Sequence, residues 1–407
     1  MLYRTMGRSE DQVSILSYGC MRFPKTKDGK FDEARTERQI LQAIDQGVNY
    51  FDTAYVYQNG ENERLLGKIL AKGVRDRVRI ATKLPPLLVH GPKDMVRILD
   101  TQLKRLRTER IDYYLLHAMK DAAGWERLQR LGMLEFLEAA RREGKIGYFG
   151  FSYHGDRQSF MGLVDAYPWD FCQIQYNYLD VNHQAGQAGL EYAAAQGLGV
   201  MVMEPLRGGT LAARMPEAVQ TIWNRFETGR TPAEGALRWV WNHPGVTTVL
   251  SGMNQEAQIA ENCRTASDSF PHALSEAELR LYDELRQTLT GLMKIGCTGC
   301  AYCLPCPAGV DIPLCFSYYN SRHLLRASSA RSQYLMFTTG INGSPPSYAS
   351  LCKGCGKCEA ACPQGLRIRE HLKEVGAEME PPFMKAIAWG VKHFLRLGRR
   401  RRQTAAE

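Results

Sequence analysis

VNYFD at residues 48–52, RVRIAT at 77–82 and IDYYLL at 111–116 are short runs of β-branched, aromatic and other apolar residues. Runs of this length and composition are typical of buried β-strands. Runs of the same kind predict further strands at VSILSYG (13–19), IGYFGF (146–151), DFCQIQY (170–176), GVMVM (199–203) and VTTVL (246–250). The first two-thirds of the chain therefore offers eight strands.

Segments with helical periodicity separate these strands. Apolar side chains recur at helical spacing in residues 34–47, 93–107, 133–143, 187–196 and 255–264. Strands that alternate with helices predict a parallel sheet, and eight of them predict that the sheet closes into a (β/α)8 TIM barrel. A Rossmann sheet is the alternative, but it would carry G-x-G-x-x-G after its first strand, where this chain has SYGCMRFP. We therefore favour the barrel.

Ionisable side chains follow three consecutive predicted strands. The second strand ends in Asp52 and is followed by Tyr57, the third is followed by Lys83 and the fourth by His117. The ends of barrel strands meet at one mouth, where active sites lie. A tyrosine has an ordinary pKa of about 10, and a buried ammonium group beside it lowers that pKa. Lys83, kept charged by Asp52, could therefore help Tyr57 give a proton to a carbonyl oxygen. His117 would bind the same oxygen, while a nicotinamide supplies hydride to the carbon.

The chain resembles the aldo/keto reductase superfamily from its first residues to about residue 265. The resemblance rests on motifs that occur in the order of the family, namely FDTA-x-x-Y…E, ATK, YLLH, IGYFGFS, QIQYN, MEPLRGG and LSGMN…AENC. It implies that Asp52, Tyr57, Lys83 and His117 form a catalytic tetrad. It also implies that a nicotinamide nucleotide, NADP or NAD, lies extended over the barrel mouth without a Rossmann fold.

The resemblance further implies which residues bind this nucleotide. Ser152 and Gln173 would hold the carboxamide. The path of the pyrophosphate would be lined by Gly19, Met21, Pro205, Leu206, Gly208, Ser251 and Gly252. Glu261 and Asn262 would meet the adenine.

The chain departs from the family at four of the implied positions. Tyr153 stands where the family often has Asn, and Met203 stands where an aromatic ring often stacks on the nicotinamide. Gly252 and Gln258 stand where Lys and Arg commonly bind the 2′-phosphate. The choice between NADP and NAD is therefore left open.

Eight cysteines fall into two quartets. The first run, CTGCAYCLPCP, contains Cys297, Cys300, Cys303 and Cys306, and the second, CKGCGKCEAACP, contains Cys352, Cys355, Cys358 and Cys362. The second is the bacterial ferredoxin run C-x2-C-x2-C-x3-C-P, and the first is one residue short before its fourth cysteine. The fourth cysteine of such a run ligates the other cluster. We therefore expect one [4Fe–4S] cluster on Cys297, Cys300, Cys303 and Cys362, and a second on Cys352, Cys355, Cys358 and Cys306.

Two alternatives remain for these cysteines. Zinc ribbons also use C-x2-C pairs, but four cysteines followed by proline in each run exceed what a tetrahedral zinc site needs. The shortened first run leaves open whether the nearby Cys315 replaces a cluster ligand.

The chain is expected to have three parts. Residues 275–293 have helical character and precede the first cysteine run, and residues 314–338, also helical in character, lie between the two runs. The parts are a barrel at 1–275, a mainly helical ferredoxin-like iron–sulfur domain at 276–380, and a basic amphipathic tail at 381–407.

Charge is concentrated at the C-terminal end. The chain has a formal charge of +9, while residues 381–407 carry seven Lys and Arg against one Glu. The remainder is nearly balanced, so we do not expect nucleic acid as a partner. We expect the tail to be a solvated end, with weak peripheral contact to anionic lipid or docking of an acidic redox partner as alternatives.

The sequence indicates that the protein is not secreted. Its first residues, MLYRTMGRSEDQ, have no apolar signal core, and no apolar run reaches the roughly 18 residues of a transmembrane helix. Cysteines in a chain of this kind are more often used in metal or redox chemistry than in disulfides. We therefore expect the protein to be located in the cytoplasm.

Together these features predict an oxidoreductase that transfers hydride to or from a small carbonyl or alcohol. The two clusters would exchange single electrons with an electron-transfer protein. A nicotinamide moves two electrons at once and each cluster moves one, so a further component, such as a flavin or a partner protein, is implied. The alternative is a non-catalytic electron carrier or redox sensor in which the barrel binds the nucleotide as a regulator.

Overall fold

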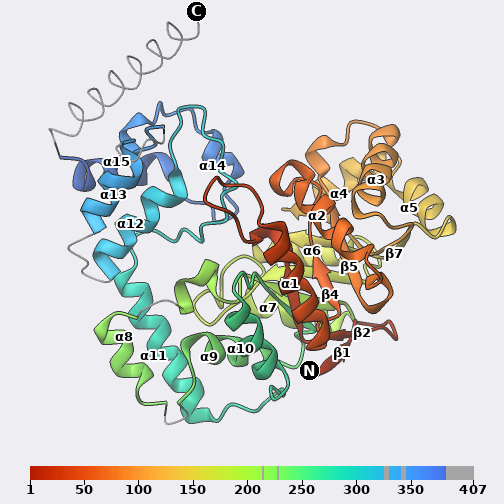
Figure 1. The fold of residues 1–407 in the computed structure, drawn as a ribbon, viewed down its shortest axis with the longest axis horizontal. Coiled ribbons are helices and arrows are strands. Elements are labelled where there is room, and N and C mark those ends of the chain that lie inside the picture. The colour runs from red at the N-terminus through yellow and green to blue at the C-terminus, as the bar shows by residue number, and fades with distance from the viewer. Residues whose placement is uncertain (213–214, 227–228, 325–329, 341–344, 382–407) are drawn as a thin grey trace, which may run out of the picture. The chain divides into compact units, whose positions relative to one another are not determined.

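The computed structural model describes residues 1–212, 215–226, 229–324, 330–340 and 345–381 (Figure 1). These residues form two compact units. The first unit contains residues 1–212, 226 and 229–282, and the second contains 215–225 and the described residues from 283 onward. The division falls inside helix α11 (Glu276–Leu292). The division into three parts that was expected from the sequence, at 1–275, 276–380 and 381–407, stays a prediction.

A closed barrel of parallel strands forms the centre of the first unit (Figure 1). Around the barrel the strands are β10 (Thr248–Ser251), β3 (Leu16–Gly19), β4 (Tyr50–Asp52), β5 (Arg79–Leu84), β6 (Ile111–Met119), β7 (Ile146–Tyr153), β8 (Phe171–Gln175) and β9 (Gly199–Met203). Each of the eight predicted runs overlaps one of these strands, and β5, β6, β7 and β10 extend beyond the predicted ends. The (β/α)8 barrel is confirmed.

Helices connect the strands. They are α1 (Glu33–Asp45), α2 (Glu61–Leu70), α3 (Pro92–Leu106), α4 (Ala122–Arg130), α5 (Met133–Arg142), α6 (Arg157–Asp165), α7 (Gly186–Ala195), α9 (Pro232–Trp241) and α10 (Glu256–Ala266). In α3, proline occupies the first position, and Met95, Ile98, Leu99 and Leu106 are buried on one face. Proline is favoured at the start of a helix because the first N–H groups have no partner within the helix. The helix ends at Arg107, which adopts a left-handed conformation.

A hairpin that the sequence did not predict precedes the barrel. It pairs β1 (Tyr3–Thr5) with β2 (Gln12–Ser14) in antiparallel register. Met6 and Val13 of this segment are buried in a cluster with Tyr113 and Phe171 of the barrel strands. The hairpin therefore contributes apolar side chains to the barrel interior.

The second unit is mainly helical, as predicted. It contains α8 (Glu217–Trp223), part of α11, α12 (Ile312–Leu324), α13 (Ala330–Thr338), α14 (Lys357–Ala361) and α15 (Ile368–Met379). Ile312 and Phe316 of α12 are buried with Leu372 and Val375 of α15 in its apolar core. Helical character predicted at 314–338 is present as α12 and α13, on either side of residues that are not described.

The predicted basic tail lies outside the described residues from residue 382 onward. Among the helices that are described, none is long and apolar enough to cross a membrane.

Candidate active site

The four predicted catalytic residues converge at one end of the barrel. Asp52 is the last residue of β4, Lys83 lies near the end of β5 and His117 lies near the end of β6. Tyr57 begins a short 3-10 turn, Tyr57–Gly60, between β4 and α2. Because β4, β5 and β6 are neighbouring parallel strands, their ends meet at the same rim.

A buried ion pair lies at the base of this site. Lys83 Nζ donates to Asp52 Oδ1 at 2.5 Å and to the carbonyl oxygen of Thr53 at 2.8 Å. The two charged side chains are only 1% and 5% exposed. Burial raises the pKa of Asp52, and the charge and hydrogen bond of Lys83 oppose that rise. Removal of either partner would leave an uncompensated buried charge, which is strongly destabilising.

Tyr57 lies against both Lys83 and His117. The ammonium nitrogen of Lys83 is 5.1 Å from the centre of the phenol ring, a cation–π distance. The His117 ring meets the Tyr57 ring edge-on, with 5.9 Å between centres and an angle of 81°. Burial lowers the pKa of His117 well below its usual value, and the positive charge of Lys83 lowers it further. His117 is therefore a neutral imidazole at pH 7, able to hydrogen-bond without carrying charge.

A polar network behind Lys83 was not foreseen from the sequence. Gln102 Nε2 donates to the carbonyl oxygen of Lys83 at 3.1 Å and to Glu63 Oε1 at 3.1 Å. Arg105 donates to Glu63 Oε2 at 3.0 Å and to the carbonyl oxygen of Tyr55 at 3.1 Å. The network joins the end of β5 to the loop that carries Tyr57. Glu63 is the glutamate that closes the FDTA-x-x-Y…E motif, so only this residue had a sequence signal.

Ser152 and Gln173 lie side by side on β7 and β8. Ser152 Oγ accepts from the backbone N–H of Ala118 at 2.8 Å, and Gln173 Nε2 lies 3.7 Å from the sulfur of Met203. Gln173 Oε1 is buried, and no described group hydrogen-bonds to it. A buried amide oxygen without a partner is costly. The donor and acceptor set fits a ligand carboxamide, which would satisfy this oxygen.

The residues implied for the pyrophosphate follow neighbouring strand ends. Gly19 ends β3, Ser251 ends the adjacent β10, and Gly252 follows it. Met21 lies in the turn after β3, and Pro205, Leu206 and Gly208 follow β9. Arg22, which the sequence argument passed over, donates to the carbonyl oxygen of Gly208 at 3.1 Å. Its Cδ lies 3.6 Å from where a Cβ on Gly252 would stand, so it adds an exposed cation to this rim.

The two residues implied for the adenine lie on α10. Asn262 is buried and donates to Ser251 Oγ at 3.2 Å. Glu261 accepts from the hydroxyl of Thr231, which caps α9. Gln258 of the same helix accepts from the backbone N–H of Asn254 at 3.2 Å.

A second imidazole, His154, lies one residue beyond β7. It is buried, and its Nδ1 is 3.2 Å from Gln184 Oε1. Burial lowers its pKa to about 4, and Lys83 of the tetrad contributes to the lowering. His154 in turn lowers the pKa of His117, so the two imidazoles share one environment. A single histidine three residues past the strand predicted at 146–151 carried no signal in the sequence.

In the second unit, the four cysteines assigned to the first cluster line one small cavity. Cys297, Cys300, Cys303 and Cys362 line it together with apolar side chains such as Phe316. Cys362 comes from the second quartet, more than fifty residues along the chain. This crossed arrangement is the one that the ferredoxin spacing predicts.

The first turns of the two cysteine runs have the same conformation. The N–H of Gly299 donates to Cys297 Sγ at 3.4 Å, and the N–H of Gly354 donates to Cys352 Sγ at 3.4 Å. Both glycines have φ of +71°, a left-handed conformation that favours glycine. Hydrogen bonds to cysteine sulfur are among the features that set cluster potential.

The remaining cysteines have other surroundings. Cys315 is buried in the apolar core, with its sulfur 3.6 Å from the carbonyl oxygen of Ser347 and 3.8 Å from Tyr334 Oη. No disulfide joins any of the twelve cysteines, all of which lie in the described ranges. Within those ranges, no three His, Cys, Asp or Glu side chains are grouped to hold a single metal ion. In a cubane each cysteine binds a different iron, so its ligands do not converge on one atom.

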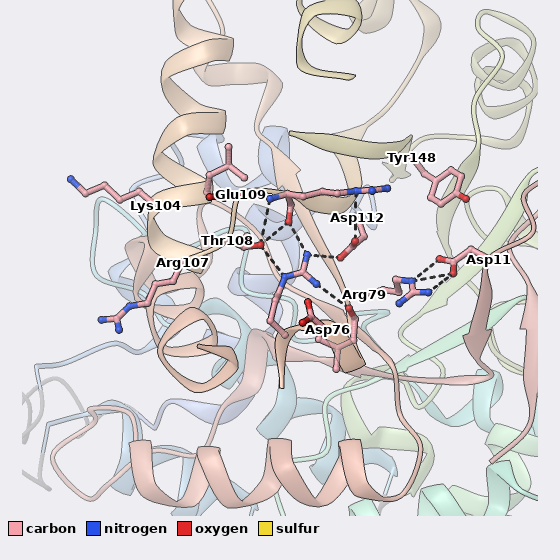
Figure 2. A pocket seen from close by; sticks show the side chains of 13 residues that line it. Asp11, Asp76, Arg79, Lys104, Arg107, Thr108, Glu109, Asp112 and Tyr148 are labelled. Carbon is pink, nitrogen blue, oxygen red and sulfur yellow. Dashed lines mark hydrogen bonds and ion pairs between the residues drawn. The ribbon is translucent and has the colours of Figure 1, made fainter. Parts of the chain in front are cut away.

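A further pocket lies at the opposite ends of the strands, where β5 begins (Figure 2). Arg79 pairs with Asp11 at 2.7 Å, and Arg75 pairs with Asp112 at 2.9 Å. In (β/α)8 barrels this end serves stability rather than catalysis. We therefore regard the pocket in Figure 2 as structural.

Comparison with known families matches both units. Residues 15–286 match the model of the aldo/keto reductase family. Residues 296–367 match the model of the 4Fe-4S dicluster domain.

The barrel region of this chain aligns with its relatives over most of their length. The chain is 28% identical to the uncharacterized oxidoreductase YrpG of Bacillus subtilis, over 66% of this chain and 92% of the relative. It is 26% identical to a putative voltage-gated potassium channel subunit beta of Schizosaccharomyces pombe, over 70% of this chain and 92% of the relative. A solved aldo-keto reductase from Klebsiella pneumoniae in complex with NADPH is 25% identical, with a TM-score of 0.58, over 70% of this chain and 96% of that one.

Proposed function

The chain belongs to the aldo/keto reductase family, and from this premise we propose that its barrel interconverts a small carbonyl compound and the corresponding alcohol with NADP or NAD. The observation that carries the proposal is the buried Asp52–Lys83 pair in contact with Tyr57 and beside His117. This arrangement can deliver a proton to a carbonyl oxygen from a residue that is otherwise too weak an acid.

Each residue of the proposed tetrad has one task in carbonyl reduction. Tyr57 Oη gives its proton to the carbonyl oxygen. Lys83 stabilises the phenolate that this leaves, and Asp52 pairs with Lys83 and orients it inside the barrel. His117 is neutral, so it can hydrogen-bond the substrate oxygen without competing as an acid. In alcohol oxidation each step runs in reverse.

Ser152 and Gln173 are proposed to hold the nicotinamide through its carboxamide. When bound, the nicotinamide supplies or accepts the hydride. The partnerless Gln173 Oε1 supports this assignment, and so does the NADPH in the Klebsiella pneumoniae relative. Gly19, Met21, Pro205, Leu206, Gly208, Ser251 and Gly252 are proposed for the pyrophosphate, and Glu261 and Asn262 for the adenine.

The second unit is proposed to hold two [4Fe–4S] clusters that exchange electrons with a protein partner. One would be bound by Cys297, Cys300, Cys303 and Cys362, and the other by Cys352, Cys355, Cys358 and Cys306. The shared cavity of the first set supports its assignment. Cys315 is proposed as a core residue and not a ligand. The thiolate ligands that this proposal requires are consistent with the reducing environment of the cytoplasm, where we place the protein.

Tyr57→Phe tests the proposed reductase activity. We expect the unmodified chain to oxidise NADPH or NADH in the presence of small aldehydes, with kcat at least about a hundredfold lower in the variant, because general acid catalysis contributes that much. Nucleotide binding, followed by quenching of protein fluorescence, should be unchanged, because Tyr57 holds the proton and not the nucleotide. Equal rates in the two proteins would contradict the proposal.

A non-catalytic redox sensor is the second candidate, because the Schizosaccharomyces pombe relative is named as a channel subunit. Nucleotide binding without turnover of any aldehyde, in a chain that holds its clusters, would favour it.

A further inference from the structure

The two cysteine runs differ in the charges that surround them. Residues 297–307 contain no charged side chain, whereas Lys353 and Lys357 stand between the cysteines of the second run. Arg369 and Lys373 follow on α15. The first run is therefore electrically neutral. In the second run Glu359 offsets one of the two lysines, and on α15 Glu370 and Glu374 accompany the two cations, so the excess of cations lies in the loop of the run itself.

The loop of the second run is also the more exposed. Gly354 and Gly356 have φ of +71° and +75°, so the backbone turns sharply twice between Cys352 and Cys358. Lys353, Gly354, Cys355 and Lys357 are all exposed. Among the described cysteines, Cys355 alone is exposed. A cluster bound by this loop would be close to solvent.

Three lysines in this region are available for an external partner. Arg369 is paired with Glu359 at 2.7 Å. Lys353, Lys357 and Lys373 have no ion-pair partner within the described part of the chain. Unpaired exposed cations create a positive potential that attracts acidic surfaces from a distance.

A groove runs beside the loop. Its lining includes Cys352 and Gly354 from the loop and Arg369, Leu372 and Lys373 from α15. A predicted cluster ligand thus lies in the wall of a groove that also presents two cations. Glu380 lines the groove as well, and its Oε1 is engaged by Tyr334 Oη and the backbone N–H of Ser350. An acidic protein segment that enters this groove would come within electron-transfer range of the cluster.

We propose that the surface formed by Lys353, Lys357, Arg369 and Lys373 is the docking site of a small acidic protein that carries one electron at a time. The proposal rests on the proposed function, because it needs a cluster at the second cysteine run. In each encounter the reduced carrier loses one electron and the oxidised cluster gains one, and no proton or bond is transferred. The reverse transfer applies when the barrel oxidises an alcohol.

Charge reversal tests this docking site. The full chain with its clusters is mixed anaerobically with reduced flavodoxin, an acidic one-electron carrier, and cluster reduction is followed by absorbance. We expect Lys353→Glu/Lys357→Glu to slow the second-order rate by about tenfold or more at low salt, and by about twofold or less at ~0.5 M salt, because salt screens charges beyond the Debye length.

Two controls separate docking from other effects. Lys93→Glu/Lys104→Glu makes the same charge change on exposed lysines of α3 and should leave the rate within about twofold. Reduced methyl viologen is a small cation, so the Lys353→Glu/Lys357→Glu variant should react with it at least as fast as the unmodified chain. A slower reaction with methyl viologen would show that the substitution changed the cluster potential, and would overturn the docking proposal.

The remaining outcomes are also decisive. Flavodoxin rates that agree within twofold between the unmodified chain and the Lys353→Glu/Lys357→Glu variant overturn the docking site alone, provided that iron analysis shows intact clusters. A chain that binds no iron overturns the proposed clusters and, with them, the docking site.

Discussion

His154 is a buried imidazole held neutral by its surroundings. Burial lowers its pKa to about 4, against an ordinary value of about 6.5. The unfolded chain therefore binds a proton on this residue at a higher pH than the folded chain does. Its contribution to stability is complete above pH 6.5 and is lost as the pH falls toward 4.

We expect the free energy of unfolding to fall by about 2 kcal/mol between pH 7 and pH 5 through His154 alone. In His154→Gln this part of the pH dependence should disappear, because glutamine does not titrate. Urea unfolding of both proteins at the two pH values, followed by tryptophan fluorescence, measures it. The same pH dependence in the variant would contradict the assignment.

At the scale of single residues, the four residues of the proposed tetrad could be predicted from the sequence, but the side chains that contact them could not. Asp52, Tyr57, Lys83 and His117 were recognisable because each belongs to a motif at a strand end. Gln102 and Arg105 reach the site from α3 through side-chain contacts, which depend on the angle at which that helix packs. Arg22 and His154 are single residues without a pattern. Such contacts become visible only when the backbone is placed.

At the scale of elements, the hairpin β1–β2 is attached to the barrel by the loop between its strands. Asp11 accepts from Arg79 at 2.7 Å (Figure 2). It also accepts from Tyr113 Oη at 2.6 Å. Burial by itself would raise the pKa of Asp11, but the hydrogen bonds from Arg79 and Tyr113 hold it below its ordinary value. The stability that this gives is present above the unfolded pKa and is lost as the pH falls through the folded pKa.

Asp11→Asn should lower the free energy of unfolding at pH 7 by about 1–3 kcal/mol, because hydrogen bonds to a charged group are replaced by weaker ones. Glu61→Gln removes an exposed ion pair with Arg64 and should cost less than about 1 kcal/mol. Urea unfolding compares the two. Equal losses of unfolding free energy in the two variants would show that the contacts of Asp11 stabilise the fold no more than an exposed ion pair does.

The barrel strands were predictable because both of their faces are buried, which leaves continuous apolar runs in the sequence. β1 is three residues long and only partly buried, so it left no such run. Val13 and Ser14 of β2 fell inside the run at 13–19, which was predicted as a single strand and is β2 and β3 in the structure. In the second unit the helical region was predicted as one segment, and α12 and α13 lie within it on either side of residues that are not described.

At the scale of the whole molecule, the chain joins an aldo/keto reductase barrel to a unit with two cysteine quartets. The proposed use of cysteines from both quartets in each cluster predicts the consequence of losing one cysteine. Cys303→Ala should lower the iron content from about eight to about four per chain, because it removes a ligand of one cluster only. Cys315→Ala, which removes a core sulfur, should keep the full content. Iron and acid-labile sulfide analysis of anaerobic preparations measures both, and equal losses would contradict the ligand assignment.

The central claim is that hydride passes between a nicotinamide and a carbonyl carbon inside the barrel. The most direct test is to supply NADPH or NADH deuterated on the transferred position together with a small aldehyde, and to analyse the alcohol by mass spectrometry. We expect one deuterium on the former carbonyl carbon of the alcohol formed by the unmodified chain, and almost no alcohol formed by Tyr57→Phe in the same time. Alcohol that forms without deuterium would contradict it, because its hydrogen would then have come from solvent and its electrons from another route.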